Sequence, residues 1–230
     1  MRLAWQRRAR LRSASLLRLP STAIVAVVRD VDIRAALIAG IRREHPDSTE
    51  NRVWSELAVV LGASRVDVCL VNDTLTGWEI KSPRDNFDRL DAQIRHYDQV
   101  LDFAHIVVTS KDIQRARARV PARWGIVEAI EQDGVVSLRR RRQARRNRRV
   151  DPLSLAQLLW RNEAMDELGT RGVRGSWSKA TRWDLWDALV AALTVEELRA
   201  AVRGRLKARP AREADRPYKQ DGATLPQRAT

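Results

Sequence analysis

Two acidic side chains and one amine are spaced so that they could act together. Asp67 lies in an alternating, β-branched stretch that is typical of a strand, and Glu79 and Lys81 lie in a second such stretch after a turn. Alternate side chains of a strand share a face, so an odd number of loop residues puts all three on one face of the hairpin. We expect a five-residue loop, 72–76, which sets Asp67 opposite Lys81 and Cys69 opposite Glu79. Neighbours on such a face lie about 4.5–8 Å apart.

This group of side chains suits the chemistry of a divalent cation. Neighbouring carboxylates repel, and each raises the pKa of the other unless a positive charge joins them. Mg²⁺ takes one or two carboxylates and keeps several waters, one of which can be activated for attack on a phosphate ester. Lys81 could position or deprotonate that water, or meet the developing negative charge. The alternative is a solvated sheet face on which Lys81 forms a cross-strand ion pair.

Three polar residues on predicted helices add to this group. Glu56 lies beside the apolar stripe of a helix expected over 51–61. Gln93 and Tyr97 lie one turn apart in a helix expected over 85–101, on the stripe that points inward, where polar groups need partners. Taken singly, Glu56 is a residue at the boundary between core and surface, and Gln93 and Tyr97 are residues at the edge of the core. Their joint occurrence with the strand residues favours a site.

The whole pattern resembles the PD-(D/E)XK nuclease superfamily, which has the restriction-endonuclease-like fold. It consists of Glu56, then Asp67, eleven intervening residues, Glu79-Ile80-Lys81 and Gln93-x-x-x-Tyr97. The last element resembles that of the RecB-like exonuclease branch. More narrowly, the stretches 65–68, 77–82 and 89–97 are similar to those of a little-characterised family of small bacterial proteins on this fold, over roughly residues 30–207.

The resemblance implies a metal site. Asp67 and Glu79 would ligate Mg²⁺ or Mn²⁺, and the carbonyl of Ile80 would complete the protein ligands. Glu56 would be the helix acid that helps to hold the metal. Val66 stands where the motif has a proline, at a position that varies in such proteins.

The resemblance also implies roles for side chains around the metal. Lys81 would serve the attacking water, and Gln93 and Tyr97 would contact the substrate or brace the site. To these we add three arginines as candidate contacts to substrate phosphates, namely Arg65, Arg141 and Arg145.

The positive charge of the chain is concentrated in two segments. Lys and Arg number 43 against 29 Asp and Glu, a formal net charge of +14. Residues 1–29 contain seven arginines and no acid, residues 139–149 contain eight and no acid, and the rest is nearly neutral. Clustered arginine indicates a polyanionic partner, usually nucleic acid. For each segment the alternative is a solvated tail or loop.

Composition excludes several other kinds of site. Cys69 is the one cysteine of the chain, so an intramolecular disulfide and a Cys-based zinc site are excluded. The three histidines are scattered, which argues against a His-rich metal site. No apolar run approaches the ~20 residues that a membrane span needs. We therefore expect no membrane partner and a cytoplasmic location.

The hairpin that carries the acids is expected to pack on one face. Val66, Val68 and Leu70 alternate along the first strand, and Trp78 and Ile80 alternate along the second. These side chains should face the core, and the acids should face away from it.

Further elements complete the predicted fold. Apolar spacing predicts a helix over 30–41, a strand over 105–110 and a second hairpin over 125–130 and 135–140. After the arginine-rich run, Asp151-Pro152 is typical of a helix start. Helices follow at about 153–168, 182–192 and 195–207, the last with a capping box from Thr194 and Glu197.

We therefore expect an α/β protein with a restriction-endonuclease-like core, in which a central mixed sheet is flanked by helices, and a small C-terminal helical bundle. The expected parts are a basic N-terminal arm, 1–29; a PD-(D/E)XK nuclease-like domain, 30–150; a helical appendage, 151–208; and a disordered tail, 209–230.

The leading prediction for function is a divalent-metal-dependent nuclease that hydrolyses phosphodiester bonds in nucleic acid, DNA in preference to RNA. One alternative is a non-catalytic nucleic-acid-binding module on the same fold. Another is a protein-interaction or regulatory component, with a partner surface that includes Trp177, Trp183 and Trp186 in place of a small aromatic core. The sequence gives no oligomeric state.

Overall fold

The computed structural model describes residues 29–210, and the structural statements below concern that part of the chain. The expected N-terminal arm, except for Arg29, and the expected tail from residue 211 onward lie outside it. Six strands form one sheet in chain order: β1 (Arg52–Val59), β2 (Ser64–Val71), β3 (Leu75–Lys81), β4 (Phe103–Thr109), β5 (Gly125–Gln132) and β6 (Val135–Arg142). The α/β class is confirmed.

The sheet is mixed. Its first three strands form an antiparallel meander, β3, β4 and β5 run parallel, and β6 returns antiparallel to β5. Parallel neighbours need a crossover connection. Helix α2 (Leu90–Val100) connects β3 to β4, and a 3-10 turn, η1 (Ser110–Asp112), followed by α3 (Ile113–Arg119), connects β4 to β5. The sequence prediction missed α3.

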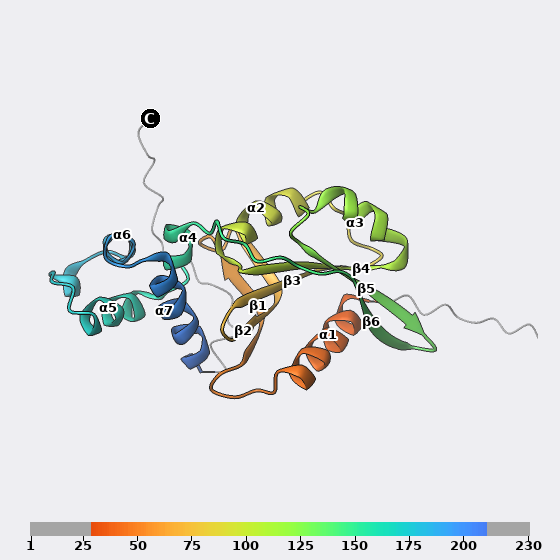
Figure 1. Cartoon of the computed structure of the whole chain (residues 1–230), viewed down its shortest axis with the longest axis horizontal. Coiled ribbons are helices and arrows are strands. Elements are labelled where there is room, and N and C mark those ends of the chain that lie inside the picture. The colour runs from red at the N-terminus through yellow and green to blue at the C-terminus, as the bar shows by residue number, and fades with distance from the viewer. Residues whose placement is uncertain (1–28, 211–230) are drawn as a thin grey trace, which may run out of the picture.

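Helices cover both faces of the sheet. Figure 1 shows α2 and α3 on one side of it and α1 (Asp30–Glu44) on the other. Ile33, Leu37 and Ile41 of α1 are buried, and their spacing of four residues makes one apolar stripe. This stripe packs on a cluster of the sheet that includes Val68 and Ile80. Helix α1 is thereby fixed across the strands that carry the predicted acids.

Four helices follow the sheet: α4 (Pro152–Ala156), α5 (Arg161–Thr170), α6 (Arg182–Ala192) and α7 (Val195–Ala208). The predicted starts are confirmed, since Asp151 caps α4 ahead of Pro152 and Thr194 with Glu197 forms the capping box of α7. The single helix expected over 153–168 is instead two helices. None of the helices described is long and apolar enough to cross a membrane.

The tryptophans of these helices form a packed cluster. Trp186 is buried in the core and meets Trp183 edge-on, with ring centroids 5.4 Å apart. Trp177 packs against the same core. Trp186 is thus a core residue, and Trp177 and Trp183 are partly buried against the same core.

The helix predicted over 51–61 is wrong, because this segment is strand β1. Glu56 has a positive φ of 56°, and the pairing of β1 with β2 is interrupted at this residue. The kink shifts the inward face by one position, so the buried residues are Trp54, Leu57 and Val59. Their uneven spacing, read as a period, imitates a helix.

The loop of the hairpin has three residues, 72–74, and not five. Val71 pairs with Leu75 and Cys69 pairs with Gly77. The loop length is odd, as expected, but the register is shifted by two residues and the residue pairs between the strands end before Asp67. The Asn72 side chain accepts from the Thr74 N–H and hydroxyl, which stabilises the short turn.

The expected division between a core face and a solvated face is wrong. Val66 belongs to the cluster on the α2 side, whereas Val68 and Leu70 belong to the cluster under α1, because β2 changes face at Asp67. Glu79 and Lys81 lie on the α2 side and are buried. Both faces of the sheet are covered, so a polar side chain on either face needs a partner inside the protein.

Candidate functional site

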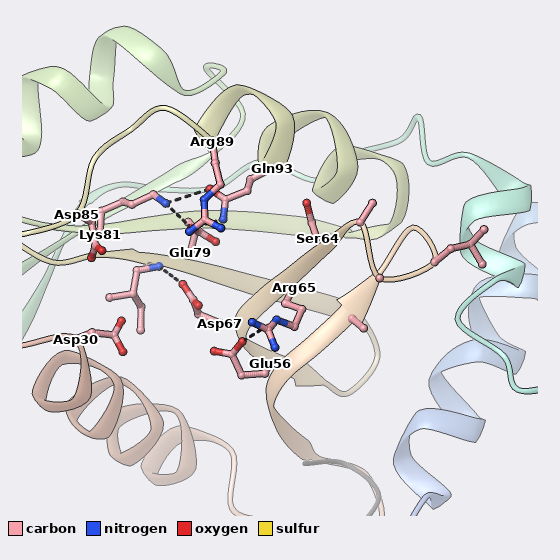
Figure 2. A pocket seen from close by; sticks show the side chains of 15 residues that line it. Asp30, Glu56, Ser64, Arg65, Asp67, Glu79, Lys81, Asp85, Arg89 and Gln93 are labelled. Carbon is pink, nitrogen blue, oxygen red and sulfur yellow. Dashed lines mark hydrogen bonds and ion pairs between the residues drawn. The ribbon is translucent and has the colours of Figure 1, made fainter. Parts of the chain in front are cut away.

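The predicted acids line one pocket, which opens where β2 and β3 separate. The ladder of residue pairs between these strands ends at the pair Val68–Trp78. Beyond it the Oδ2 atom of Asp67 accepts a hydrogen bond of 2.7 Å from the backbone N–H of Ile80. The cavity has a volume of about 670 Å³, and Asp67, Glu79 and Lys81 all line it (Figure 2). The structure therefore brings together the three residues that the sequence singled out.

Glu79 and Lys81 are held in a hydrogen-bonded cluster by helix α2. Oε1 of Glu79 lies 2.8 Å from Nζ of Lys81 and accepts from Nε2 of Gln93 at 2.6 Å. Nζ of Lys81 also donates to Oε1 of Gln93 at 3.1 Å. Gln93 thus touches both charged groups, with one donor and one acceptor, and fixes their orientation.

Tyr97 braces the same carboxylate one helical turn further on. Its hydroxyl lies 2.5 Å from Oε2 of Glu79 and also contacts the backbone carbonyl of Arg65. A tyrosine has one hydroxyl proton, so it serves one of these acceptors at a time. Burial first, and then the negative charge of Glu79, raise the pKa of Tyr97 well above its usual value. Tyr97 is therefore a neutral donor that orients Glu79, and Tyr97 does not line the pocket.

The environment of Asp67 disfavours the charged form of its carboxyl group. Its pKa is raised to about 7, chiefly by burial and then by the nearby charge of Glu79. The hydrogen bond from Ile80 and the charge of Arg34 act in the opposite direction. A carboxylate in this situation gains from any further positive charge that reaches it.

Glu56 lines the pocket from strand β1, not from a helix as predicted. Its Oε1 atom lies 2.9 Å from Nη1 of Arg34, and its Oε2 atom lies 3.3 Å from Nε of Arg65. Both carboxylate oxygens are thus paired with arginines. The acid that a helix brings to the pocket is Asp30, at the start of α1.

Arg34 and Asp30 were missed by the sequence prediction. Arg34 donates to the carbonyl of Asp67 at 2.7 Å and to Oδ1 of Asp67 at 3.2 Å. Asp30 lies one turn earlier on α1 and pairs with Arg34 at 3.3 Å. The i, i+4 spacing of Asp30 and Arg34 was a readable signal for the pair, but its contact with β2 depends on how α1 packs.

Two arginines with exposed side chains line the pocket. Arg65, predicted as a phosphate contact, lines it and is 57% exposed despite its ion pair with Glu56. Arg89, just before α2, also lines it (Figure 2). Within residues 29–210 the Arg89 side chain forms no hydrogen bond or ion pair. The sequence prediction did not single out Arg89, although it stands inside one of the quoted motif stretches.

Arg141 and Arg145 do not belong to this pocket. Arg141 lies in edge strand β6 and pairs with Glu128 at 2.7 Å, together with Arg139. Arg145 is exposed after the strand and away from the residues that line the cavity. Part of the arginine-rich segment is therefore occupied in holding the sheet edge, and the rest presents charge to solvent.

The side chains near Asp67 offer two carboxylates to a hard cation, and within residues 29–210 no third acidic ligand joins them. Across the described residues, no three His, Cys, Asp or Glu side chains gather closely enough to hold a metal ion. Asp67 and Glu79 supply two carboxylates in one pocket, and burial together with the charge of Glu79 raises the pKa of Asp67. Mg²⁺ accepts one or two carboxylates and keeps waters. The pair therefore fits such an ion, and Glu56 does not join it.

Comparison with known proteins gives one family. A family model described as bacteriophage P4 protein cII matches residues 26–221 of this chain. Protein cII of Enterobacteria phage P4 is 24% identical over 183 residues, which are 80% of this chain and 68% of that protein. Among solved structures, a protein of unknown function from Silicibacter pomeroyi aligns with 62% of this chain and 92% of its own, at 21% identity and a TM-score of 0.37. A match at this TM-score does not identify a shared fold.

Proposed function

The chain belongs to the family of bacteriophage P4 protein cII, and from its pocket we propose that it is a divalent-metal-dependent nuclease that hydrolyses phosphodiester bonds in nucleic acid. The observation that carries this proposal is the meeting of Asp67, Glu79 and Lys81, from two adjacent strands, in one polar cavity. Metal-assisted phosphoryl hydrolysis uses oxygen ligands that hold the ion and its water, and an amine beside them can stabilise the developing negative charge.

The resemblance to the PD-(D/E)XK superfamily supports the same proposal. In that reading Asp67 and Glu79 hold Mg²⁺ or Mn²⁺, with the Ile80 carbonyl beside them. The bound ion would supply a polarised water and neutralise charge on the phosphate. A mixed sheet flanked by helices is the coarse architecture that the resemblance implies, and we propose the restriction-endonuclease-like core as its finer description.

Each protein side chain then has a part that its contacts support. Glu79 and Gln93 hold the ammonium of Lys81 in a buried position, where a fixed positive charge stabilises a developing negative charge more strongly than in water. Tyr97 keeps Glu79 in place. Arg65 and Arg89 line the same pocket and would contact the phosphates next to the scissile one.

The partner we propose is nucleic acid, DNA in preference to RNA. The formal net charge of +14 and the exposed arginines that follow β6 favour a sequence-independent attraction to phosphates. A cytoplasmic location is part of the same proposal.

A second candidate is a nucleic-acid-binding module without catalysis. One observation favours it: Arg34 already neutralises Asp67 and Glu56, so the acids have a cation from the protein itself. Such a module would bind nucleic acid and leave it intact.

The deciding experiment is a nuclease panel on the full chain. Single- and double-stranded DNA and RNA are incubated with Mg²⁺ or Mn²⁺, and cleavage and gel retardation are both scored. We expect Asp67→Ala and Lys81→Ala to abolish cleavage and to leave binding largely intact, while Asp73→Ala, in the exposed hairpin turn, behaves as the wild type. Cleavage that persists unchanged in the first two variants refutes the site. Retardation without cleavage under all conditions supports the second candidate.

A further inference from the structure

Arg34 is bound to three acids at the side of the pocket that faces α1. Its guanidinium lies 3.2 Å from Oδ1 of Asp67, 2.9 Å from Oε1 of Glu56 and 3.3 Å from Oδ1 of Asp30. It also donates to the backbone carbonyl of Asp67 at 2.7 Å. One side chain thus joins helix α1 to the two strands at the point where their pairing is interrupted.

Both oxygens of Asp67 are already engaged. Oδ2 accepts from the N–H of Ile80, and Oδ1 accepts from Arg34. The first bond is made by the backbone of a buried strand, which cannot move away without breaking the sheet. Oδ1 is therefore the oxygen that a side-chain movement can free for a cation, because Arg34 holds it with a side chain and not with the backbone of a strand.

We propose that Arg34 is an internal counter-cation for this pocket, and that a divalent cation binds Asp67 in exchange for the Arg34 guanidinium. The inference rests on the proposed function in one respect, since it takes Asp67 and Glu79 as the cation ligands. Two positive charges a few ångströms apart on one carboxylate repel each other strongly when water is largely excluded. The divalent cation and the Arg34 guanidinium therefore compete for Asp67, and each binds it more tightly when the other is absent.

The exchange needs a movement of one side chain and not of the helix. Ile33 and Leu37, on either side of Arg34, are buried against the sheet and keep α1 in place. Asp30 is about half exposed and lies one turn before Arg34, at the outer end of the site. It offers the released guanidinium an ion pair nearer to solvent, so the exchange does not leave a buried charge without a partner.

Titration calorimetry of the full chain with Mn²⁺, at constant ionic strength and mildly alkaline pH, tests this inference. Arg34→Met keeps much of the apolar stem and removes the charge. We expect Arg34→Met to bind Mn²⁺ more tightly than the wild type, by a factor of about ten or more.

Arg42→Met is the matched control, because Arg42 lies on the same helix and pairs with Asp47 on the exposed side. It should bind Mn²⁺ as the wild type does. Adding Asp67→Asn to Arg34→Met should abolish the gain.

A second measurement covers the case in which Arg34→Met fails to fold. In the wild type, addition of Mg²⁺ should shift the Nε–Hε resonance of Arg34 and leave that of Arg42 unchanged. Equal or weaker Mn²⁺ binding by Arg34→Met, or an Arg34 resonance that does not respond to Mg²⁺, overturns the exchange.

The outcomes separate this inference from the proposed nuclease function. Tighter binding by Arg34→Met without cleavage by any of the proteins supports the exchange and counts against catalysis. Cleavage by the wild type together with unchanged Mn²⁺ affinity in Arg34→Met supports catalysis and overturns the exchange. If neither the wild type nor Arg34→Met binds Mn²⁺, both proposals fall.

Discussion

The backbone N–H of Ile80 donates to Oδ2 of Asp67 at 2.7 Å, just beyond the last residue pair that joins β2 to β3. A side chain here replaces the carbonyl that would continue the ladder. It satisfies a backbone donor in the interior, and it directs the carboxylate of Asp67 toward the strand that carries Glu79 and Lys81. The end of the ladder therefore opens the pocket and also orients the carboxylate of Asp67 within it.

Tyr97→Phe should destabilise the protein and reduce cleavage together. The substitution removes the donor to buried Glu79 and keeps the ring, which stacks on Trp124 with centroids 5.9 Å apart. Loss of one partner of a buried charged acceptor costs about 1–3 kcal/mol. Urea denaturation measures the cost. Tyr97→Leu, which also loses the ring, should cost more; a cost near zero for Tyr97→Phe would mean that the hydroxyl contributes nothing.

Arg89→Gln should weaken binding to nucleic acid with little effect on stability. Arg89 is exposed at the pocket, so its loss removes one phosphate contact. Fluorescence anisotropy in EDTA, over a range of salt concentrations, should show a slope of log affinity against log salt that is smaller by about 1.

Arg84→Gln is the control for that measurement. Arg84 is equally exposed on the same connection but does not line the pocket. A loss of affinity of the same size in both variants would indicate general charge attraction and not a contact at the pocket.

The stability of the protein should fall in mild acid through His105. Burial lowers the pKa of His105 from 6.5 to about 4, and its ring stacks on Trp78 at 5.1 Å. The unfolded chain takes up the proton more readily than the folded one, so this contribution is complete above pH 6.5 and is lost as the pH falls toward 4.

His105→Gln provides the comparison for this pH dependence. Thermal unfolding of wild type and variant is measured from neutral pH to pH 4, and the difference between the two curves isolates this residue. Over that range the free energy of unfolding of the wild type should fall relative to that of His105→Gln. A difference that is independent of pH would contradict the assignment.

Arg209→Met should destabilise the C-terminal helices strongly. Arg209 makes two hydrogen bonds to buried Glu163, of 2.7 and 2.6 Å, and lies 4.0 Å from the ring centre of Trp160. Removing one partner of a buried ion pair costs about 3–5 kcal/mol. Guanidinium denaturation should show this loss.

Arg119→Met is the control for Arg209. Arg119 pairs with Asp91 on the surface, where an ion pair contributes about 0–1 kcal/mol. Similar losses for the two variants would show that the Arg209 pair is not worth more than a surface contact. Arg209, which the sequence prediction assigned to a tail, is buried.

The sequence alone determined which side chains share a side of the hairpin and how several helices begin. The period of two residues in a strand places Glu79 and Lys81 together for any register. Asp67 lines the same pocket although β2 changes face there. The caps at Asp151 and Thr194 depend on residues three positions apart, so they were readable as well. The period of four in α2 put Gln93 and Tyr97 on one inward face, and both contact Glu79.

Tertiary structure decided the register, the burial and the charges that meet at the pocket. A kink at Glu56 made strand β1 look like a helix, because the local period was broken by one positive φ. The contact of Arg34 with Asp67 spans 33 positions in the chain and depends on how α1 packs across the sheet. Likewise, the pairing of Arg141 with Glu128 follows from the register of an edge hairpin. Local patterns fix the direction of a side chain relative to its own strand or helix, but its partner is chosen by the packing of elements that are distant in sequence.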